Sequence, residues 1–195
     1  FQVAEGFQRT HDRKKYLLRM LVFALISEIP FNYLYYSSPV FPFHQNVMFT
    51  FFIALLLMLG LEKVRSKGAG LYILAAVLSL PVGYFLGTLG MVDYYGSGVV
   101  TVLIFYLCRQ IPHGWIGEVA GLAFLNCKLL GGMTIPLTLG SWTLEFPEQG
   151  LALLALIPIW LYNGRQGAHN KAIQYACYAF YPAHMLILAL LRMYL

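Results

Sequence analysis

Charged side chains are scarce in this sequence. Only 11% of the 195 residues are Asp, Glu, Lys or Arg, whereas roughly 25% are charged in a typical soluble domain. Hydrophobic residues make up 59%, so the chain has too little polar surface to cover a water-facing globule. The same composition excludes an intrinsically disordered chain and a coiled coil. We therefore predict an all-α fold, a polytopic bundle of transmembrane helices in contact with membrane lipid.

Cysteine is also scarce. The three cysteines are odd in number and lie in apolar surroundings, which excludes a secreted disulfide scaffold. Gly-rich phosphate loops, Gly-x-Ser-x-Gly nucleophile elbows and Cys/His metal spacings are missing. The sequence therefore predicts no metal site and argues against an ATP-driven pump or a metallohydrolase. The 13 basic residues outnumber the 8 acidic ones, but membrane topology explains this excess without a nucleic-acid partner.

Long apolar segments are what the sequence contains instead. At about 20 residues per crossing, the chain has room for roughly seven transmembrane helices, which we assign to a single domain over residues 1–195. Residues 1–7 are typical of the inner end of a helix that begins before this sequence does. The predicted crossings cover residues 16–36, 43–61, 70–92, 96–108, 115–130, 150–162 and 172–194.

Three of these crossings are irregular. The fourth and the sixth are too short to span a bilayer comfortably, so we expect them to tilt or to be buried among their neighbours. The fifth continues beyond residue 130 into a Gly- and Pro-interrupted stretch, where a re-entrant hairpin is the alternative. Lys and Arg fall in alternate loops, beginning with residues 9–19. Because basic loops stay in the cytoplasm, the start of the chain is predicted to lie inside and Leu195 outside.

Two ionisable residues are predicted to lie at the depth of the hydrocarbon core. Glu28 and His184 each follow the predicted cytoplasmic start of a helix, Tyr16 or Ala172, by 12 positions. At 1.5 Å per residue, both lie ~18 Å into the membrane. An ionisable group at this depth is costly unless it is paired, and such groups usually serve function. We predict that these two side chains pair within a polar pocket that opens outward.

Further polar residues accompany this pair. On the last predicted helix, Gln174, Cys177, Tyr181 and His184 are spaced by three, four and three residues, which places them along one face. On the second predicted helix, Asn46 lies near the outer end. The alternative for all of these groups is structural, because hydrogen bonds between membrane helices also fix their packing.

Several short motifs occur in the order found in one protein family. They are residues 5–7, 15–19, 26–31, 45–50, 93–94, 162–167 and 178–184. On these motifs the sequence resembles the TraX family, named for the F-pilin acetylation protein, over essentially the whole chain. The resemblance implies a multi-pass acyltransferase of the bacterial inner membrane, with acetyl-CoA as its co-substrate. The implied acceptor is an amino group, such as the N-terminus of a pilin-like peptide, or a glycan.

The resemblance also implies an earlier helix with an Asp-His pair, which we expect to be missing from this sequence. Acetyl transfer requires a base for the acceptor and donors for the oxyanion. We assign His184 as the general base, or as a helper to the missing histidine, and Glu28 as the residue that orients it. Tyr181 or Asn46 is the expected oxyanion donor.

Basic and polar residues of the predicted cytoplasmic rim are expected to hold the phosphates of CoA. These residues are Arg9, Lys14, Lys15, Arg19, Asn163 and Arg165. A proton- or solute-coupled transporter, in which Glu28 and His184 form a proton relay, is the main alternative function. An inert membrane scaffold is the third.

Overall fold

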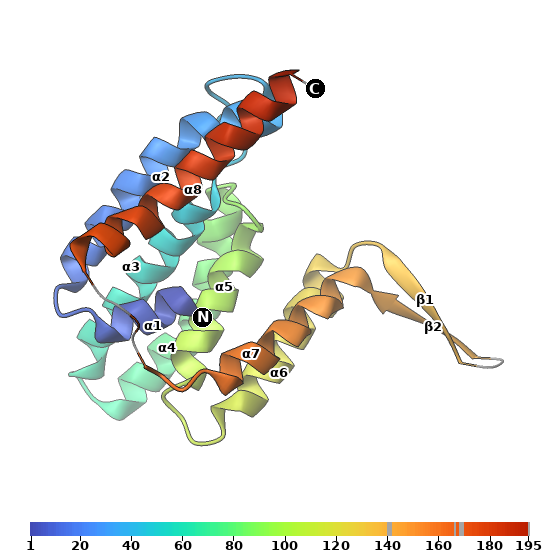
Figure 1. Ribbon diagram of the computed structural model, residues 1–195. Helices are drawn as coiled ribbons and strands as arrows, with labels where there is room; N and C mark the ends of the chain where they lie inside the picture. Colours follow the sequence, from blue (N-terminus) through green and yellow to red (C-terminus); the bar gives the residue numbers. More distant parts are fainter. Residues whose placement is uncertain (140–141, 166, 168–169, 195) are drawn as a thin grey trace.

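Helices dominate the computed structural model, which describes residues 1–139, 142–165, 167 and 170–194 and confirms the all-α prediction. Figure 1 shows the helices arranged as a bundle with an arm at one side. The elements, in chain order, are α1 (Gln2–Arg9), α2 (Arg13–Tyr36), α3 (Val47–Arg65), α4 (Ala69–Leu89), α5 (Tyr95–Cys108), α6 (Gly114–Phe124), η1 (Leu125–Leu130), β1 (Thr134–Leu139), β2 (Trp142–Pro147), η2 (Glu148–Ala155), α7 (Leu156–Leu161) and α8 (Lys171–Tyr194).

Four helices are long and apolar enough to cross a membrane. They are α2, α3, α4 and α8, the last counted over Lys171–Met193. The fold is therefore that of a membrane protein. The two shorter apolar segments are α5 and the η2–α7 stretch, which correspond to the two crossings that the sequence marks as short.

The short helix α5 lies at the centre of the bundle, where it packs against α3, α4 and α6. Its Val99, Leu103 and Tyr106 side chains are fully buried, which confirms that this segment is buried among its neighbours. Glycines permit the close approach of α4 to α5, because a Cβ atom added at Gly96 would overlap the backbone of Tyr84. Burial of this kind lets a 14-residue helix remain at membrane depth, because protein rather than lipid surrounds it.

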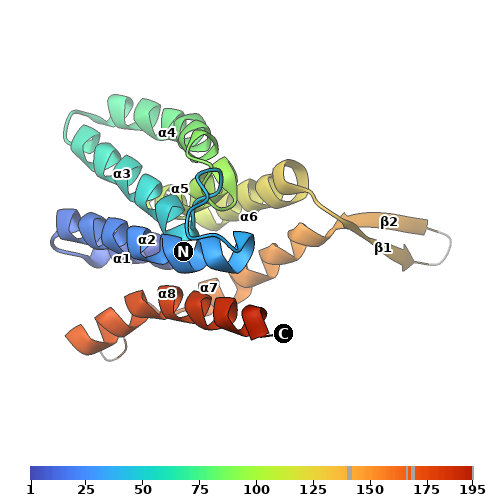
Figure 2. The same cartoon turned by 90° about the horizontal axis from the view of Figure 1, so that it is seen from above.

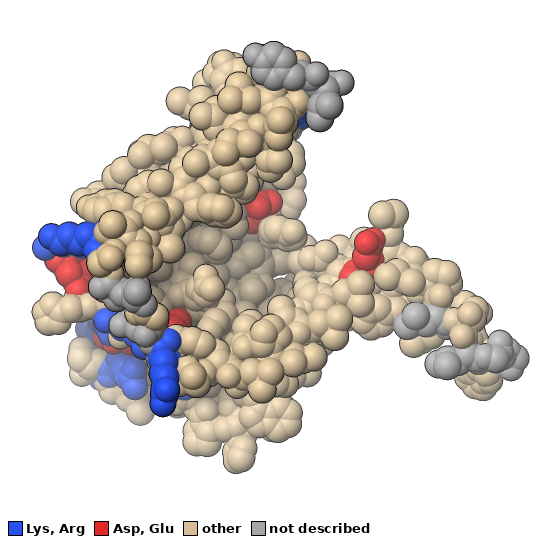
Figure 3. Space-filling view, viewed as in Figure 1, with Lys and Arg blue, Asp and Glu red and all other residues tan. Residues whose placement is uncertain are grey.

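Helices α2 and α8 lie side by side and run in the same direction, as Figures 1 and 2 both show. Asp12 caps the start of α2 by accepting a hydrogen bond from the Lys15 backbone N–H at 3.0 Å. Ser37 ends the helix in a left-handed conformation, with a φ of 53°. Both helices begin at the end of the molecule where Lys and Arg side chains gather (Figure 3). This arrangement agrees with the basic side that the sequence predicts.

The segment after η1 differs from the sequence prediction. The fifth crossing was expected to continue past residue 130, but the helix ends there because Gly131 and Gly132 adopt positive φ angles of 53° and 87°. β1 and β2 then form an antiparallel hairpin, from the Thr134–Pro147 pair to the Leu139–Trp142 pair. Threonine and isoleucine favour strands. The hairpin projects from an arm built by α6, η1, η2 and α7 (Figures 1 and 2).

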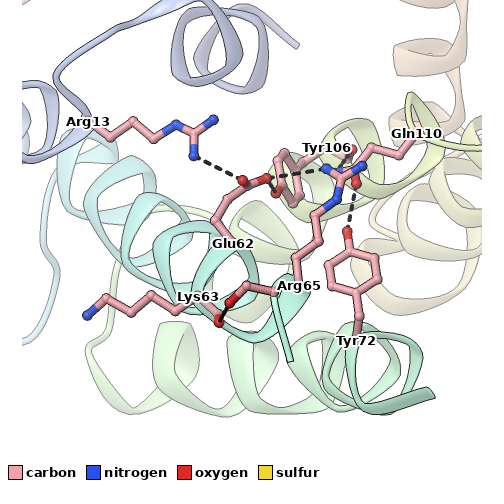
Figure 4. Close-up of polar contacts among 8 residues, drawn as sticks. Arg13, Glu62, Lys63, Arg65, Tyr72, Tyr106 and Gln110 are labelled. Carbon is pink, nitrogen blue, oxygen red and sulfur yellow. Dashed lines mark hydrogen bonds and ion pairs between the residues drawn. The ribbon is translucent and has the colours of Figure 1, made fainter. Parts of the chain in front are cut away.

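A carboxylate clamp holds three helices together at the basic end (Figure 4). Glu62, near the end of α3, accepts hydrogen bonds from Arg13 of α2 at 3.0 Å and from the Tyr106 hydroxyl of α5 at 2.6 Å. The Arg65 guanidinium lies 3.6 Å from Oε1 of the same Glu62 carboxylate. The clamp fixes the start of α2, which forms one wall of the candidate site.

Replacing Glu62 with alanine should therefore destabilise the protein. The Glu62→Ala change leaves the fully buried Tyr106 hydroxyl without its acceptor, a loss that typically costs about 1–3 kcal/mol. The measurement is the thermal unfolding midpoint of the detergent-solubilised protein. Lys63→Ala is the control, because this neighbouring side chain is exposed. Equal midpoints for the two variants would contradict the clamp.

Candidate functional site

A cavity of about 570 Å³ opens at the basic end of the bundle, between α1, α2, α3 and α8. This volume lies within the range of about 300–1,000 Å³ typical of small-molecule sites. Its walls combine apolar side chains such as Met20, Met48 and Phe51 with polar ones. The polar residues that line it include Arg9, Thr10, His11, Arg19, Gln174 and Cys177. We call it the rim cavity.

Of the six residues predicted to bind CoA, Arg9 and Arg19 line the rim cavity. The Arg19 Nε atom is buried and has no hydrogen-bond partner among the described residues. Lys14 and Lys15 are exposed and do not line it, and Lys15 forms an ion pair with Asp12 at 3.1 Å. The structure thus brings the two arginines, but not the two lysines, to the same cavity.

The predicted turn at residues 162–165 lies beside the rim cavity rather than in its wall. Arg9 donates hydrogen bonds to the Glu5 carboxylate at 2.5 Å and to the Gly164 carbonyl at 2.6 Å. Asn163 and Arg165 are exposed, and the Asn163 side chain accepts from the Arg165 backbone N–H at 3.0 Å. Arg9 therefore connects the turn to α1 at the mouth of the cavity.

A polar centre surrounds Glu28 at the start of α3. The Asn46 amide donates to the Glu28 carboxylate at 2.5 Å and to the Ala24 carbonyl at 2.9 Å. Asn32 donates to the other Glu28 oxygen at 3.3 Å. The Asn46 oxygen caps α3 by accepting from the Met48 backbone N–H at 3.0 Å. Both donors of the fully buried Asn46 amide are thus engaged, and the α3 N-terminus, whose dipole favours negative charge, faces the carboxylate.

Two contacts fix the register between α2 and α8. The Phe23 ring stacks on the Tyr178 ring at 4.9 Å between centroids, and further along Arg192 donates a hydrogen bond to the Leu34 carbonyl. The residue numbers differ by 155 in the first pair and by 158 in the second. A difference of 156 separates Glu28 from the predicted α8 histidine, so the two residues lie at the same level of the helix pair.

That histidine, His184, shares a level with Glu28 without bonding to it. Its Nδ1 atom lies 2.9 Å from the Phe180 carbonyl of its own helix, and its ring stacks on Phe180 at 5.0 Å. No hydrogen bond or ion pair joins His184 to Glu28 in the described part of the chain. The neighbouring Tyr181 ring contacts the imidazole edge-on, with 5.4 Å between the ring centroids. The Tyr181 hydroxyl is buried and has no hydrogen-bond partner among the described residues.

A second ionisable pair lies at the same end of α3 and was missed by the sequence analysis. His44 Nε2 lies 3.6 Å from the Asp93 carboxylate, and His44 Nδ1 forms a 2.6 Å hydrogen bond with the Tyr36 hydroxyl. Thr50 donates to the Asp93 carbonyl at 2.9 Å. His44 and Asp93 each stand in a loop beside a helix end, so on sequence alone they resemble ordinary solvated residues. Only the fold brings the two loops together.

Comparisons with known proteins agree with the motifs in the sequence. The family model described as TraX protein matches residues 1–192. The probable fimbrial assembly protein FimC, serogroup H1, of Dichelobacter nodosus is 28% identical over 207 residues, an alignment that covers 100% of this chain and 78% of the relative. No solved structure matches.

The environment of Asp93 makes the stability of the protein depend on pH. Burial raises the pKa of its carboxyl above the ordinary value of 3.8, and the nearby His44 only partly offsets this rise. The folded state therefore holds the proton more tightly than the unfolded state, so this residue lowers the free energy of unfolding as the pH rises through the raised pKa. The wild-type unfolding midpoint minus that of Asp93→Asn should accordingly fall between acidic and neutral pH. A difference that stays constant or rises would contradict this environment for Asp93.

Proposed function

The chain belongs to the TraX family, and from this membership and the site geometry we propose that it is an acetyltransferase of the bacterial inner membrane. It takes acetyl-CoA into the rim cavity at the basic, cytoplasmic side. It transfers the acetyl group to an amino group, with the N-terminus of a pilin-like subunit as the preferred acceptor. The Dichelobacter nodosus relative, described as a probable fimbrial assembly protein, supports this acceptor over a glycan.

One observation carries the proposal: the rim cavity has two arginines in its wall and borders the first turn of α3. Arg9 and Arg19 line it, and so does Met48. The Met48 backbone N–H donates to Asn46, which in turn donates to Glu28, although neither Asn46 nor Glu28 lines the cavity itself. A CoA thioester has the matching polarity, with anionic phosphates at one end and a narrow, less polar arm at the other. Guanidinium groups suit the phosphates because they bind such anions bidentately.

The polar centre supplies the groups that acetyl transfer requires. The acceptor amine loses a proton to a base, its nitrogen attacks the thioester carbonyl, the C–S bond breaks, and the CoA thiolate leaves and takes up a proton. We assign the base to His184, whose ring is held by the Phe180 carbonyl, and we assign Glu28, at the same level of the helix pair, to supporting the charged form of the imidazole. Tyr181 is the better oxyanion donor, because the Asn46 donors are engaged by Glu28 and Ala24.

Arg19→Gln should raise the KM for acetyl-CoA by about tenfold or more, because a hydrogen bond to a charged group contributes about 1.5–3 kcal/mol. Lys15→Gln is the matched control: it removes a positive charge one helical turn away on an exposed side chain. The measurement is transfer of radiolabelled acetyl from acetyl-CoA to a peptide with a free N-terminus, by protein reconstituted in nanodiscs. Equal KM values for the two variants would contradict the assignment of the rim cavity to CoA.

His184→Ala should lower kcat by about 10²–10⁴-fold, the usual contribution of a general base. The pH dependence of kcat should lose its acidic limb, a change that a merely structural histidine would not cause. Leu188→Ala, on the exposed face of the same helix, controls for packing.

Glu28→Gln should lower kcat with a small change in KM. Label-free solute uptake that depends on Glu28, without acetyl transfer, would instead support the transporter.

A further inference from the structure

A second cavity, of about 290 Å³, lies beside α3 and is bordered by α5, η1, η2 and α7. We call it the arm cavity. Its walls are largely apolar and include Val47, Phe51, Val102, Phe105, Leu122 and Ile159. Phe51 lines the rim cavity as well, so one α3 side chain contributes to both. Figure 3 shows the molecule hollowed between the α2–α8 side and the arm.

Asp93 carries the one acidic or basic side chain among the residues described as lining the arm cavity. The Thr50 hydroxyl holds the Asp93 backbone carbonyl at 2.9 Å, and His44 lies 3.6 Å from the side-chain carboxylate. Thr50 and Ser97 also line the cavity. Thr101, Asn126 and Gln149 add further polar side chains to a wall that is otherwise mainly apolar, and neighbouring residues fix the position of Asp93.

We propose that the arm cavity binds the amino-terminal end of the acceptor polypeptide, with Asp93 holding the terminal ammonium and the apolar walls holding the first side chains. This inference rests on the proposed function, because it names the site of the acceptor for that same reaction. Charge complementarity supports it: a single acidic side chain in a mainly apolar wall fits a ligand that carries one positive charge on an apolar body.

The environment of Asp93 favours a role in binding over a role in stability. Burial disfavours its charged form, and a partly desolvated carboxylate stabilises a fold little without a well-formed partner. A terminal ammonium would supply that partner and three hydrogen-bond donors.

The two cavities share a wall at the first turns of α3, which would bring the acetyl donor and the acceptor together. The acceptor would reach the first turns of α3 from the arm side, and the thioester would reach them from the rim side. Val47 and Thr50 line the arm cavity, Met48 lines the rim cavity, and Phe51 lines both. On leaving Asp93, the terminal amine would give its proton to the base and meet the thioester beside Asn46 and its bonded Glu28, where the proposed function locates the reaction.

Peptide binding without acetyl-CoA tests the inference independently of activity. The probe is a short fluorescent peptide that begins Ala-Val-Leu, prepared with either a free or an acetylated N-terminus. We expect the wild-type protein in nanodiscs to prefer the free form by about tenfold or more. Asp93→Asn should abolish that preference. Glu145→Gln, which removes the same charge from an exposed position on the hairpin, should retain it.

A second variant keeps the test valid if Asp93→Asn alters folding. Ala155→Phe places a large ring in the arm cavity wall and should weaken binding of both peptide forms, while the affinity for acetyl-CoA stays unchanged. Equal binding of the free and acetylated peptides by the wild-type protein would overturn the inference, as would equal behaviour of Asp93→Asn and Glu145→Gln. Acetyl transfer that persists with such a result would leave the proposed function standing. Asp93-dependent binding without any transfer would instead refute the function and leave the cavity assignment.

Discussion

The hydrogen bonds of one buried amide determine how the centre of this protein is built. Asn46 links α2 to α3 by donating to Ala24 and Glu28, and it caps α3 through the Met48 backbone. A carboxylate at membrane depth is costly unless polar groups surround it, and this amide supplies them. Because the cap fixes where α3 begins, it also fixes the directions of the side chains in its first turns. Those turns contribute walls to both cavities.

The arrangement around α3 also depends on the short central helix. α5 is too short to cross a bilayer alone, yet its buried face packs on α3 and α4. This packing lets the arm of α6, η1, η2 and α7 stand apart from the α2–α8 pair (Figure 1). The hollow that results is bordered by α3 on one side and by the arm on the other.

The sequence predicts much of this fold because hydrophobic length and helical rise are local properties. Counting residues from the helix starts places Glu28 and His184 at one level, and the Phe23–Tyr178 stack bears out that level. Which groups touch depends on helix rotation and loop path, which one sequence does not reveal. His44 and Asp93 lie 49 positions apart, and loops joined at Gln45 and Val92 bring them together. The sequence likewise did not predict the hairpin after Gly132, because its apolar residues are also typical of a transmembrane helix.

Several buried polar atoms along α2 and α8 are unpaired within the described residues, which packing alone does not explain. If Glu28 and its neighbours served only to join helices, the buried donors and acceptors along the seam would be expected to satisfy one another, since a partly satisfied network is less stable than an apolar one. Glu28 and Asn46 meet that expectation, but three other groups along α2 and α8 do not. The Arg19 Nε, the Asn32 Oδ1 and the Tyr181 hydroxyl are buried without a hydrogen-bond partner in the described part of the structure. Arg19 lines the rim cavity, Asn32 bonds Glu28 and Tyr181 contacts His184, so the unpaired atoms occur in both regions to which function is assigned.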